Sequence, residues 1–383
     1  MNDSLLRYYH FAVFYTVFYS LVRLTSMPDT YAIVRFVTDG GMFFCSFYFV
    51  VVWLLHSDVR IIERIIGVSM VLIACMLLVS FHYRILLELT FLLSTRIGFS
   101  YDDILKKIIK YSLITFVIVY LTSLLGITSN TAFLRDDMYE VDTLFTAHSF
   151  GFYYYSAPAY LFMNVIVGLL YLSKGQCSRR NFILLVLLSF LVFALFTTRL
   201  QLVVNIVMFI AYLVIYNTNG YYFESRVAKY FSILAYPLMA LCVFIVFSDA
   251  EFFDEDMLIL LNLIFNGRLH FNQEAFEKFG VLWNGNLVET STGTLMEDYF
   301  FIDCGYIDIL IRYGYIMTFF ILVVFSMVFY KIYHAKEKFL YIYMMLFVFT
   351  SFVNNFFFAA SFFSLPLLYG CTFATKENEE LYV

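Results

Sequence analysis

Long apolar runs separated by short polar segments dominate the pattern along this chain. Residues 182–196, 200–216 and 231–247 contain no charged side chain. A helix needs about 20 apolar residues, in a range of roughly 17–25, to cross the hydrocarbon core of a bilayer. The pattern therefore predicts an all-α, polytopic membrane protein.

We predict about twelve transmembrane helices within a single integral membrane domain over residues 1–383. The first apolar run, residues 10–22, is predicted to be a retained spanning helix, because no small-residue cleavage site follows it. The approximate centres of the predicted spans are Phe14, Phe47, Val71, Phe91, Ile118, Val165, Leu188, Met208, Leu238, Phe320, Phe347 and Leu365.

The composition agrees with this interpretation and excludes a soluble enzyme. Hydrophobic residues make up 62% of the chain and charged residues 14%, against about 45–50% and about 25% in soluble domains. The net charge of −5 gives no support to a nucleic-acid partner. The cysteines show neither metal-ligand nor redox spacing, so we expect no disulfide, no metal and no cofactor.

Basic residues predict the orientation of the helices. They cluster in four short connections, at 106–110, 174–180, 226–229 and 331–338, which all fall on one side of the predicted topology. Lys and Arg in short loops mark the cytoplasmic side. We therefore expect a multi-pass protein of the bacterial cytoplasmic membrane with both termini in the cytoplasm.

The opposite side of the predicted topology is acidic. Ser248 to Gly305 forms a long extracytoplasmic loop between the ninth and tenth spans, with eleven acidic residues against Arg268 and Lys278. Thr128 to Ser149 is a second acidic segment. Because long loops on a scaffold often carry function, we expect the chemistry to face outward.

Parts of the long loop are predicted to be ordered. The apolar segment Asp256 to Phe265 is suited to lie along the membrane surface. The segment Leu269 to Phe279 predicts a short helix with Phe271 and Ala275 on its apolar stripe.

Two arginines are the leading candidates for binding a phosphate. Arg268 begins the short helix predicted in the acidic loop, and a helix N-terminus with a guanidinium suits phosphate oxygens. Arg199 lies in a Thr-Thr-Arg segment between two apolar spans, at the outer boundary. The structural alternatives are an ion pair with neighbouring carboxylates for Arg268 and contact with lipid headgroups for Arg199.

Other charged residues have comparable structural explanations. Arg84 and Glu88 are four residues apart on the short fourth span and can pair, and Arg96 lies near its cytoplasmic end. Arg135 and Arg312 are further candidates near the outer face, where a structural role is the alternative.

A general base is predicted among the outer residues. Asp303 lies at the entry to the tenth span, where a boundary carboxylate suits proton abstraction, and a helix N-cap is its structural alternative. His148, His270 and Glu297 are the other candidates. No Ser-His-Asp order, Gly-rich phosphate loop or metal spacing is present.

Four segments, in order, resemble a known family. AHSFGF from Ala147, TTR ending at Arg199, NGRLHFNQEAFEKFG from Asn266 and IDCGYIDILIRYG from Ile302 are similar to motifs of the Wzy-type polymerases of O-antigen and capsule repeat units. The resemblance covers roughly Leu121 to Ile332. It departs from the family pattern at Ala147, where the family has an arginine, and at Tyr154 to Pro158, where the family's His and Asn are missing.

The resemblance implies a metal-independent inverting glycosyltransferase, related to the O-antigen ligases and built from membrane helices. Its donor and acceptor would be undecaprenyl-diphosphate-linked oligosaccharides, with a chain-length regulator and a flippase as possible partners in capsule or exopolysaccharide synthesis. Arg199 and Arg268 would hold the pyrophosphates, Arg135, Arg312 and Tyr306 would contact substrate, and Asp303 or His148 would be the base.

Two rival functions remain open from the sequence. A flippase or exporter of the same lipid-linked sugars should show charges at mid-membrane and related halves, and the chain shows little of either. A non-catalytic assembly subunit should tolerate replacement of Arg199 and Arg268. A ligase that uses another acceptor stays within the first class of function.

Overall fold

The computed structural model describes most of the chain, which divides into two compact units. The described residues are 3–56, 61–77, 83–128, 132–135, 145–154, 156–217, 225–248, 257, 259, 268–288, 291–292, 299–300, 302, 304–352, 359 and 361–373. Unit 1 comprises Met1–Asp58, Thr90–Gly220 and Ala359–Val383, and unit 2 comprises Val59–Leu89 and Tyr221–Phe358. The single membrane domain predicted from the sequence stays a prediction.

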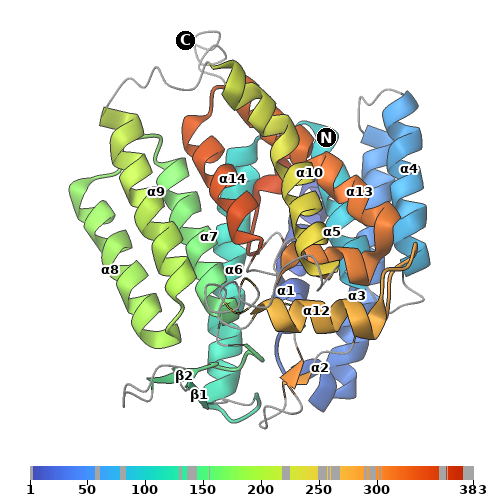
Figure 1. Cartoon of the computed structure of the whole chain (residues 1–383), viewed down its shortest axis with the longest axis horizontal. Helices are drawn as coiled ribbons and strands as arrows, with labels where there is room; N and C mark the ends of the chain where they lie inside the picture. The colour runs from blue at the N-terminus through green and yellow to red at the C-terminus, as the bar shows by residue number, and fades with distance from the viewer. Residues whose placement is uncertain are drawn as a thin grey trace. The chain divides into compact units, whose positions relative to one another are not determined.

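Unit 1 is a helical bundle with one short strand pair. Its neighbouring helices include α7, α8 and α9, which pack side by side (Figure 1). Its elements are α1 (Asp3–Val22), α2 (Met27–Thr30), α3 (Ala32–His56), η2 (Thr95–Ile97), α6 (Tyr101–Leu124), β1 (Ala132–Arg135), β2 (Phe145–His148), α7 (Ser156–Leu172), α8 (Arg179–Phe196), α9 (Arg199–Asn217) and η5 (Leu365–Tyr369).

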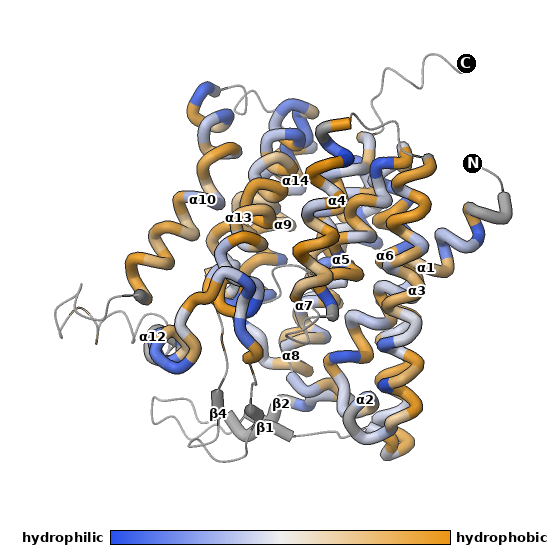
Figure 2. The backbone as a smooth tube through the Cα atoms, turned by 90° about the vertical axis from the view of Figure 1, so that its right-hand side faces the viewer, coloured by the Kyte–Doolittle hydropathy of each residue, from blue (hydrophilic) through white to orange (hydrophobic). Residues whose placement is uncertain are grey.

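Unit 2 is built around the pairing of α10 with α13. Figure 2 colours α10 mainly as hydrophobic, whereas α12 carries strongly hydrophilic residues. Its elements are α4 (Ile61–Met76), the first part of α5 (Tyr83–Ser94), α10 (Arg226–Ser248), α12 (Arg268–Phe279), β3 (Ser291–Thr292), β4 (Tyr299–Phe300), α13 (Gly305–His334) and α14 (Lys338–Thr350). The remainder of α5 belongs to unit 1.

The chain is predominantly helical, as predicted. Every predicted span centre from Phe14 to Phe347 lies inside a helix. Five helices among the described residues, α3, α8, α9, α10 and α13, are long and apolar enough to cross a membrane. The all-α prediction is confirmed for the described residues, which contain two short antiparallel strand pairs, β1 with β2 and β3 with β4, beside the helices.

The predicted centre at Leu365 needs a correction. It lies in η5, a 3₁₀ helix of five residues, which at about 2 Å per residue is far shorter than a hydrocarbon core of about 30 Å. Leu365 and Leu368 are fully buried, and Ser364 contacts the amide of Asn164 at 3.3 Å. The segment is apolar because it packs inside unit 1.

Two of the four predicted basic clusters share an end in each unit. In unit 1, Lys174 lies 3.5 Å from Asp102, so the clusters 106–110 and 174–180 share an end. In unit 2, the phenol of Tyr341 donates to the carbonyl of Ala228 at 2.9 Å, which joins the start of α10 to the turn between α13 and α14. Within each unit the two clusters share an end, as the sequence predicts, and the placement of all four clusters on one side stays a prediction.

A break divides α13 at Gly314. This glycine has φ 74° and ψ 176°, a combination that only glycine adopts readily. The segment 282–288 lies in the break: the N–H of Asn286 donates to the carbonyl of Ile311 at 2.8 Å, and the N–H of Tyr315 donates to the carbonyl of Leu282 at 3.3 Å. The segment therefore supplies backbone partners that the interrupted helix lacks.

Candidate functional site

A sharp corner between α8 and α9 positions Arg199 in unit 1. Thr197 ends α8 in the left-handed conformation, with φ 50°, and its N–H donates to the carbonyl of Phe193 at 2.7 Å. Thr198 is buried, and its hydroxyl has no hydrogen-bond partner among the described residues. Arg199 is then the first residue of α9, with its side chain exposed. The first N–H groups of a helix lack partners within it and attract anions, so this corner combines two anion-binding elements.

His148 belongs to the same end of unit 1. It is exposed at the end of β2, and its ring lies 5.8 Å from that of Phe150. Phe150 in turn meets Phe196, the last residue of α8, edge to face at 5.5 Å. Two of the four resembling segments, Ala147 onward and the Thr-Thr-Arg segment, thus come together in the structure.

The turn after His148 requires a glycine at position 151. Phe150 and Gly151 both have positive φ, 47° and 94°, and the N–H of Phe152 closes the turn on the carbonyl of Ser149 at 3.0 Å. A Cβ on Gly151 would lie 2.8 Å from the hydroxyl of Thr128. A glycine is therefore required at this position, which fixes how β2 approaches α8.

Arg135 lies on the partner strand of β2. It is the last residue of β1 and pairs in register with Phe145, while His148 pairs with Ala132 at the other end of the ribbon. The side chain of Arg135 lies outside what the structure describes, so its predicted contact with substrate stays a prediction.

The predicted short helix of the long loop is confirmed as α12 in unit 2. It begins at Arg268, as the sequence predicts, and Ala275 of the predicted apolar stripe is fully buried. The side chains of Arg268, His270 and Phe271 lie outside the described residues, as do the turn at Asn266 and most of Asp256 to Phe265.

A buried amide ties α12 to the start of α13. Asn272 is 1% exposed, and its side-chain oxygen accepts the N–H of Cys304, the N-cap of α13, at 3.4 Å. The other two resembling segments, from Asn266 and from Ile302, thus also come together within one unit. Asp303 and Glu297 lie outside the described residues, so their predicted roles as a base are not tested.

Arg312 is held by partners of its own unit. Its Nε donates to Asp308 at 2.6 Å and its Nη1 to the carbonyl of Val288 at 3.1 Å. The side chain of Arg312 is one-fifth exposed. It therefore fastens the segment 282–288 to α13, which agrees with the structural alternative, and the exposed fraction leaves room for a contact with substrate.

Further charged side chains, which the sequence did not predict to be near Arg312, belong to the same unit. Arg84 and Glu88 of α5 act electrostatically on Tyr313, together with Asp308 and Arg312. Glu88 is only 4% exposed, and the Nε of Arg84 is buried without a hydrogen-bond partner among the described residues. The spacing of Arg84 and Glu88 predicts that they pair with each other, but gives no signal that α13 supplies further charges.

A second ion pair was also missed from the sequence. Arg23 of unit 1 pairs with Asp39, and its guanidinium lies 5.7 Å from the ring of Tyr19. The next residue along, Leu24, accepts the N–H of Tyr153 at 2.7 Å. Arg23 therefore stands near the segment that follows His148, with its guanidinium paired to Asp39.

Comparison with protein-family models, with curated protein sequences and with solved structures gives no significant match. The resemblance to the polymerases accordingly rests on the four segments and on their placement.

The described part of the chain contains no cluster of side chains suited to a metal ion. There, no three His, Cys, Asp or Glu side chains gather as a metal ion would require. Metal-independent chemistry stays a prediction.

Tyr306 is placed in the interior of unit 2. It is 3% exposed, and its hydroxyl donates to the carbonyl of Val348 at 2.9 Å. This geometry gives Tyr306 a role in joining α13 to α14.

Replacing Tyr306 by phenylalanine is expected to lower the free energy of unfolding by about 1 kcal/mol, the net contribution of one hydrogen bond, with little change in activity. Chemical denaturation in detergent and a product assay measure the two quantities. Loss of activity in a variant as stable as the wild type would instead return Tyr306 to the substrate site.

Proposed function

We propose that this protein is an oligosaccharide repeat-unit polymerase, an inverting glycosyltransferase of the outer face of a bacterial cytoplasmic membrane. It transfers a growing glycan from undecaprenyl diphosphate to the non-reducing end of a new lipid-linked repeat unit. The observation that carries the proposal is that both candidate arginines, Arg199 and Arg268, are the first residues of helices.

Glycosyl transfer from a lipid diphosphate needs positive groups that stabilise the leaving group, and the two arginines can supply them. The bond between the anomeric carbon and the phosphate oxygen of the donor breaks, and its electron pair leaves with undecaprenyl diphosphate. The acceptor hydroxyl attacks from the opposite face of the sugar and gives its proton to a base. Guanidinium groups and helix N-termini stabilise the charge that develops on the leaving group.

A general base must take the proton of the acceptor hydroxyl. A base must come within hydrogen-bond reach of the acceptor hydroxyl. His148 is exposed near the Arg199 corner, which supports it as a candidate, and Asp303 is the alternative.

The number of spans determines on which side of the membrane the region 248–305 and the C-terminus lie. Because Leu365 lies in a packed segment, eleven spans remain, and with a cytoplasmic N-terminus they would place the region 248–305 outside the cell. The C-terminus would then also lie outside, whereas a twelfth span would place it in the cytoplasm. A cysteine-labelling reagent that does not cross membranes distinguishes these arrangements.

One observation favours the alternative of a flippase or exporter. Glu88 is a buried acidic residue on α5, a helix rich in leucine. Ionisable groups inside a membrane commonly mark a transport pathway. A flippase would move lipid-linked sugars across vesicles without lengthening them.

A ladder assay tests the proposal. Purified protein in nanodiscs is supplied with the lipid-diphosphate-linked repeat unit of its own host, and products are separated on a gel. The wild type is expected to give regularly spaced bands, and Arg268→Ala to give a much weakened ladder. Lys278→Ala, at the other end of the same helix, is the control and should leave the ladder intact.

The outcomes separate the candidate functions. No ladder from folded wild-type protein with authentic substrate would contradict the polymerase and favour the flippase. A ladder unaffected by Arg268→Ala would keep the function and remove Arg268 from the site.

A further inference from the structure

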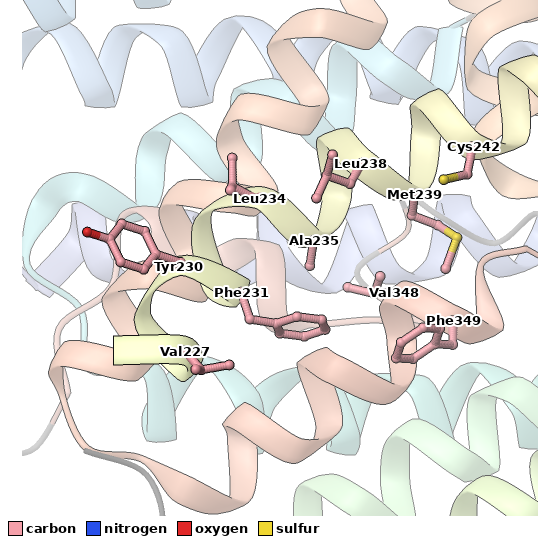
Figure 3. A pocket seen from close by; sticks show the side chains of 10 residues that line it. All are labelled: Val227, Tyr230, Phe231, Leu234, Ala235, Leu238, Met239, Cys242, Val348 and Phe349. Atoms are coloured by element: carbon pink, nitrogen blue, oxygen red, sulfur yellow. The ribbon is translucent and has the colours of Figure 1, made fainter. Parts of the chain in front are cut away.

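An apolar groove runs along α10 in unit 2. Its lining residues on α10 recur every three or four positions from Val227 to Cys242, so they share one face of the helix. Val348 and Phe349 of α14 line the other side (Figure 3). The cavity holds about 490 Å³, a volume typical of small-molecule sites.

The groove suits a hydrocarbon chain. Its lining contains no charged residue, and α10 is one of the helices able to cross a membrane. The stripe from Val227 to Cys242 extends about 22 Å along the helix at 1.5 Å per residue. This exceeds half of a hydrocarbon core of about 30 Å, so an acyl chain from one leaflet fits within it.

One end of the groove is basic. Arg226 and Lys229 lie in the first turn of α10, interleaved with Val227 and Tyr230 of the lining. Arg226 is exposed and Lys229 is partly exposed. The groove therefore opens, at this end, next to two cations.

The turn between α13 and α14 adds further positive charge at the same end. Tyr341 donates to the carbonyl of Ala228 at 2.9 Å, which holds α14 against the first turn of α10. Lys336 and Lys338 flank this turn, with Glu337 between them. The described residues at this end thus carry a net positive charge.

We propose that this groove binds one anionic phospholipid, with an acyl chain along α10 and the headgroup phosphate at Arg226 and Lys229. Basic pockets between membrane helices recognise anionic headgroups, and each basic residue near the surface strengthens the attraction by about fivefold. The positive charge at one end of the groove suits an anionic headgroup, and the apolar lining along the rest of it suits an acyl chain. An anionic phospholipid has both. The site is separate from the residues assigned to glycosyl transfer.

Native mass spectrometry of the delipidated full chain tests the headgroup. Phosphatidylglycerol is titrated against phosphatidylcholine with the same acyl chains. We expect a single tight phosphatidylglycerol adduct, and Arg226→Ala combined with Lys229→Ala should weaken it about 30-fold, as two basic residues imply. Arg179→Ala with Arg180→Ala, in the first turn of α8, is the matched control and should change it little.

The second pair of variants tests the groove. Leu238 lines it and is 53% exposed, whereas Leu241 is 54% exposed on the same helix and does not line it. Leu238→Trp should weaken binding of both lipids at least fivefold, and Leu241→Trp should not. Both positions are exposed, so each variant is expected to fold.

Several outcomes would overturn the proposal. These are equal affinity for the two lipids, equal losses in the α8 control, or equal effects of the two tryptophans. Displacement of the lipid by millimolar inorganic phosphate alone would also overturn it, because headgroup charge without the chain would then account for binding.

Discussion

Polymer formation is expected to fall at least a hundredfold when Arg199 is replaced by alanine. Arg199 is exposed at the first position of α9, beside helix N–H groups that favour an anion. Loss of one preorganised donor to a developing negative charge costs about 10²–10³ in rate. The rate of ladder extension with purified lipid-linked repeat units measures the effect.

Two further variants test whether the loss of activity in Arg199→Ala is specific to the guanidinium at this position. Arg199→Lys keeps the charge but loses the planar fork that matches phosphate, so we expect an intermediate rate. Arg179→Ala removes an exposed arginine from the first position of α8, and it should extend chains at the wild-type rate. Wild-type activity in Arg199→Ala would favour an assembly subunit or a structural role for this arginine.

Gly314→Ala is expected to be the most destabilising single substitution in unit 2 proposed here. The backbone conformation at Gly314 costs another residue about 1–3 kcal/mol. A Cβ there would also lie 2.4 Å from the carbonyl oxygen of Trp283 and 2.5 Å from the nitrogen of Gly285. The midpoint of thermal unfolding in detergent should fall by about 5–10 °C.

Hydrogen exchange shows whether the damage arises where expected. In Gly314→Ala, the amides of Asn286 and Tyr315, which bridge the segment 282–288 and α13, should exchange faster. Gly280→Ala is the control, because Gly280 also has positive φ, 60°, but no atom lies within 4 Å of the added Cβ. Unchanged protection of Asn286 in Gly314→Ala would contradict the role given to the break.

Hydrophobic runs predicted the helices well, because a run of apolar residues of this length has few alternatives to a helix. They failed at Leu365, since hydropathy does not distinguish a side chain facing lipid from one packed against protein. Leu365 and Leu368 are buried in unit 1, and the turn beyond them packs Gly370 against the backbone of Arg96. The sequence around Leu365 does not indicate that this segment packs against Arg96.

The candidate site was only partly predictable for a related reason. Arg268 at a helix start follows from local spacing, and α12 confirms it. The approach of Phe150 to Phe196 and the hydrogen bond from Cys304 to Asn272 join residues far apart in the chain. Such contacts depend on how helices pack, which a single sequence leaves open.

The break in α13 also indicates where the membrane surface lies. The stretch from Tyr315 to His334 is about 20 residues long, and a helix of that length matches the hydrocarbon core. Tyr315 and Trp283, whose rings lie 5.4 Å apart, then fall at the headgroup level, where aromatic side chains concentrate. The first turns of α13, with Asp308 and Arg312, would then stand above the hydrocarbon, within reach of water.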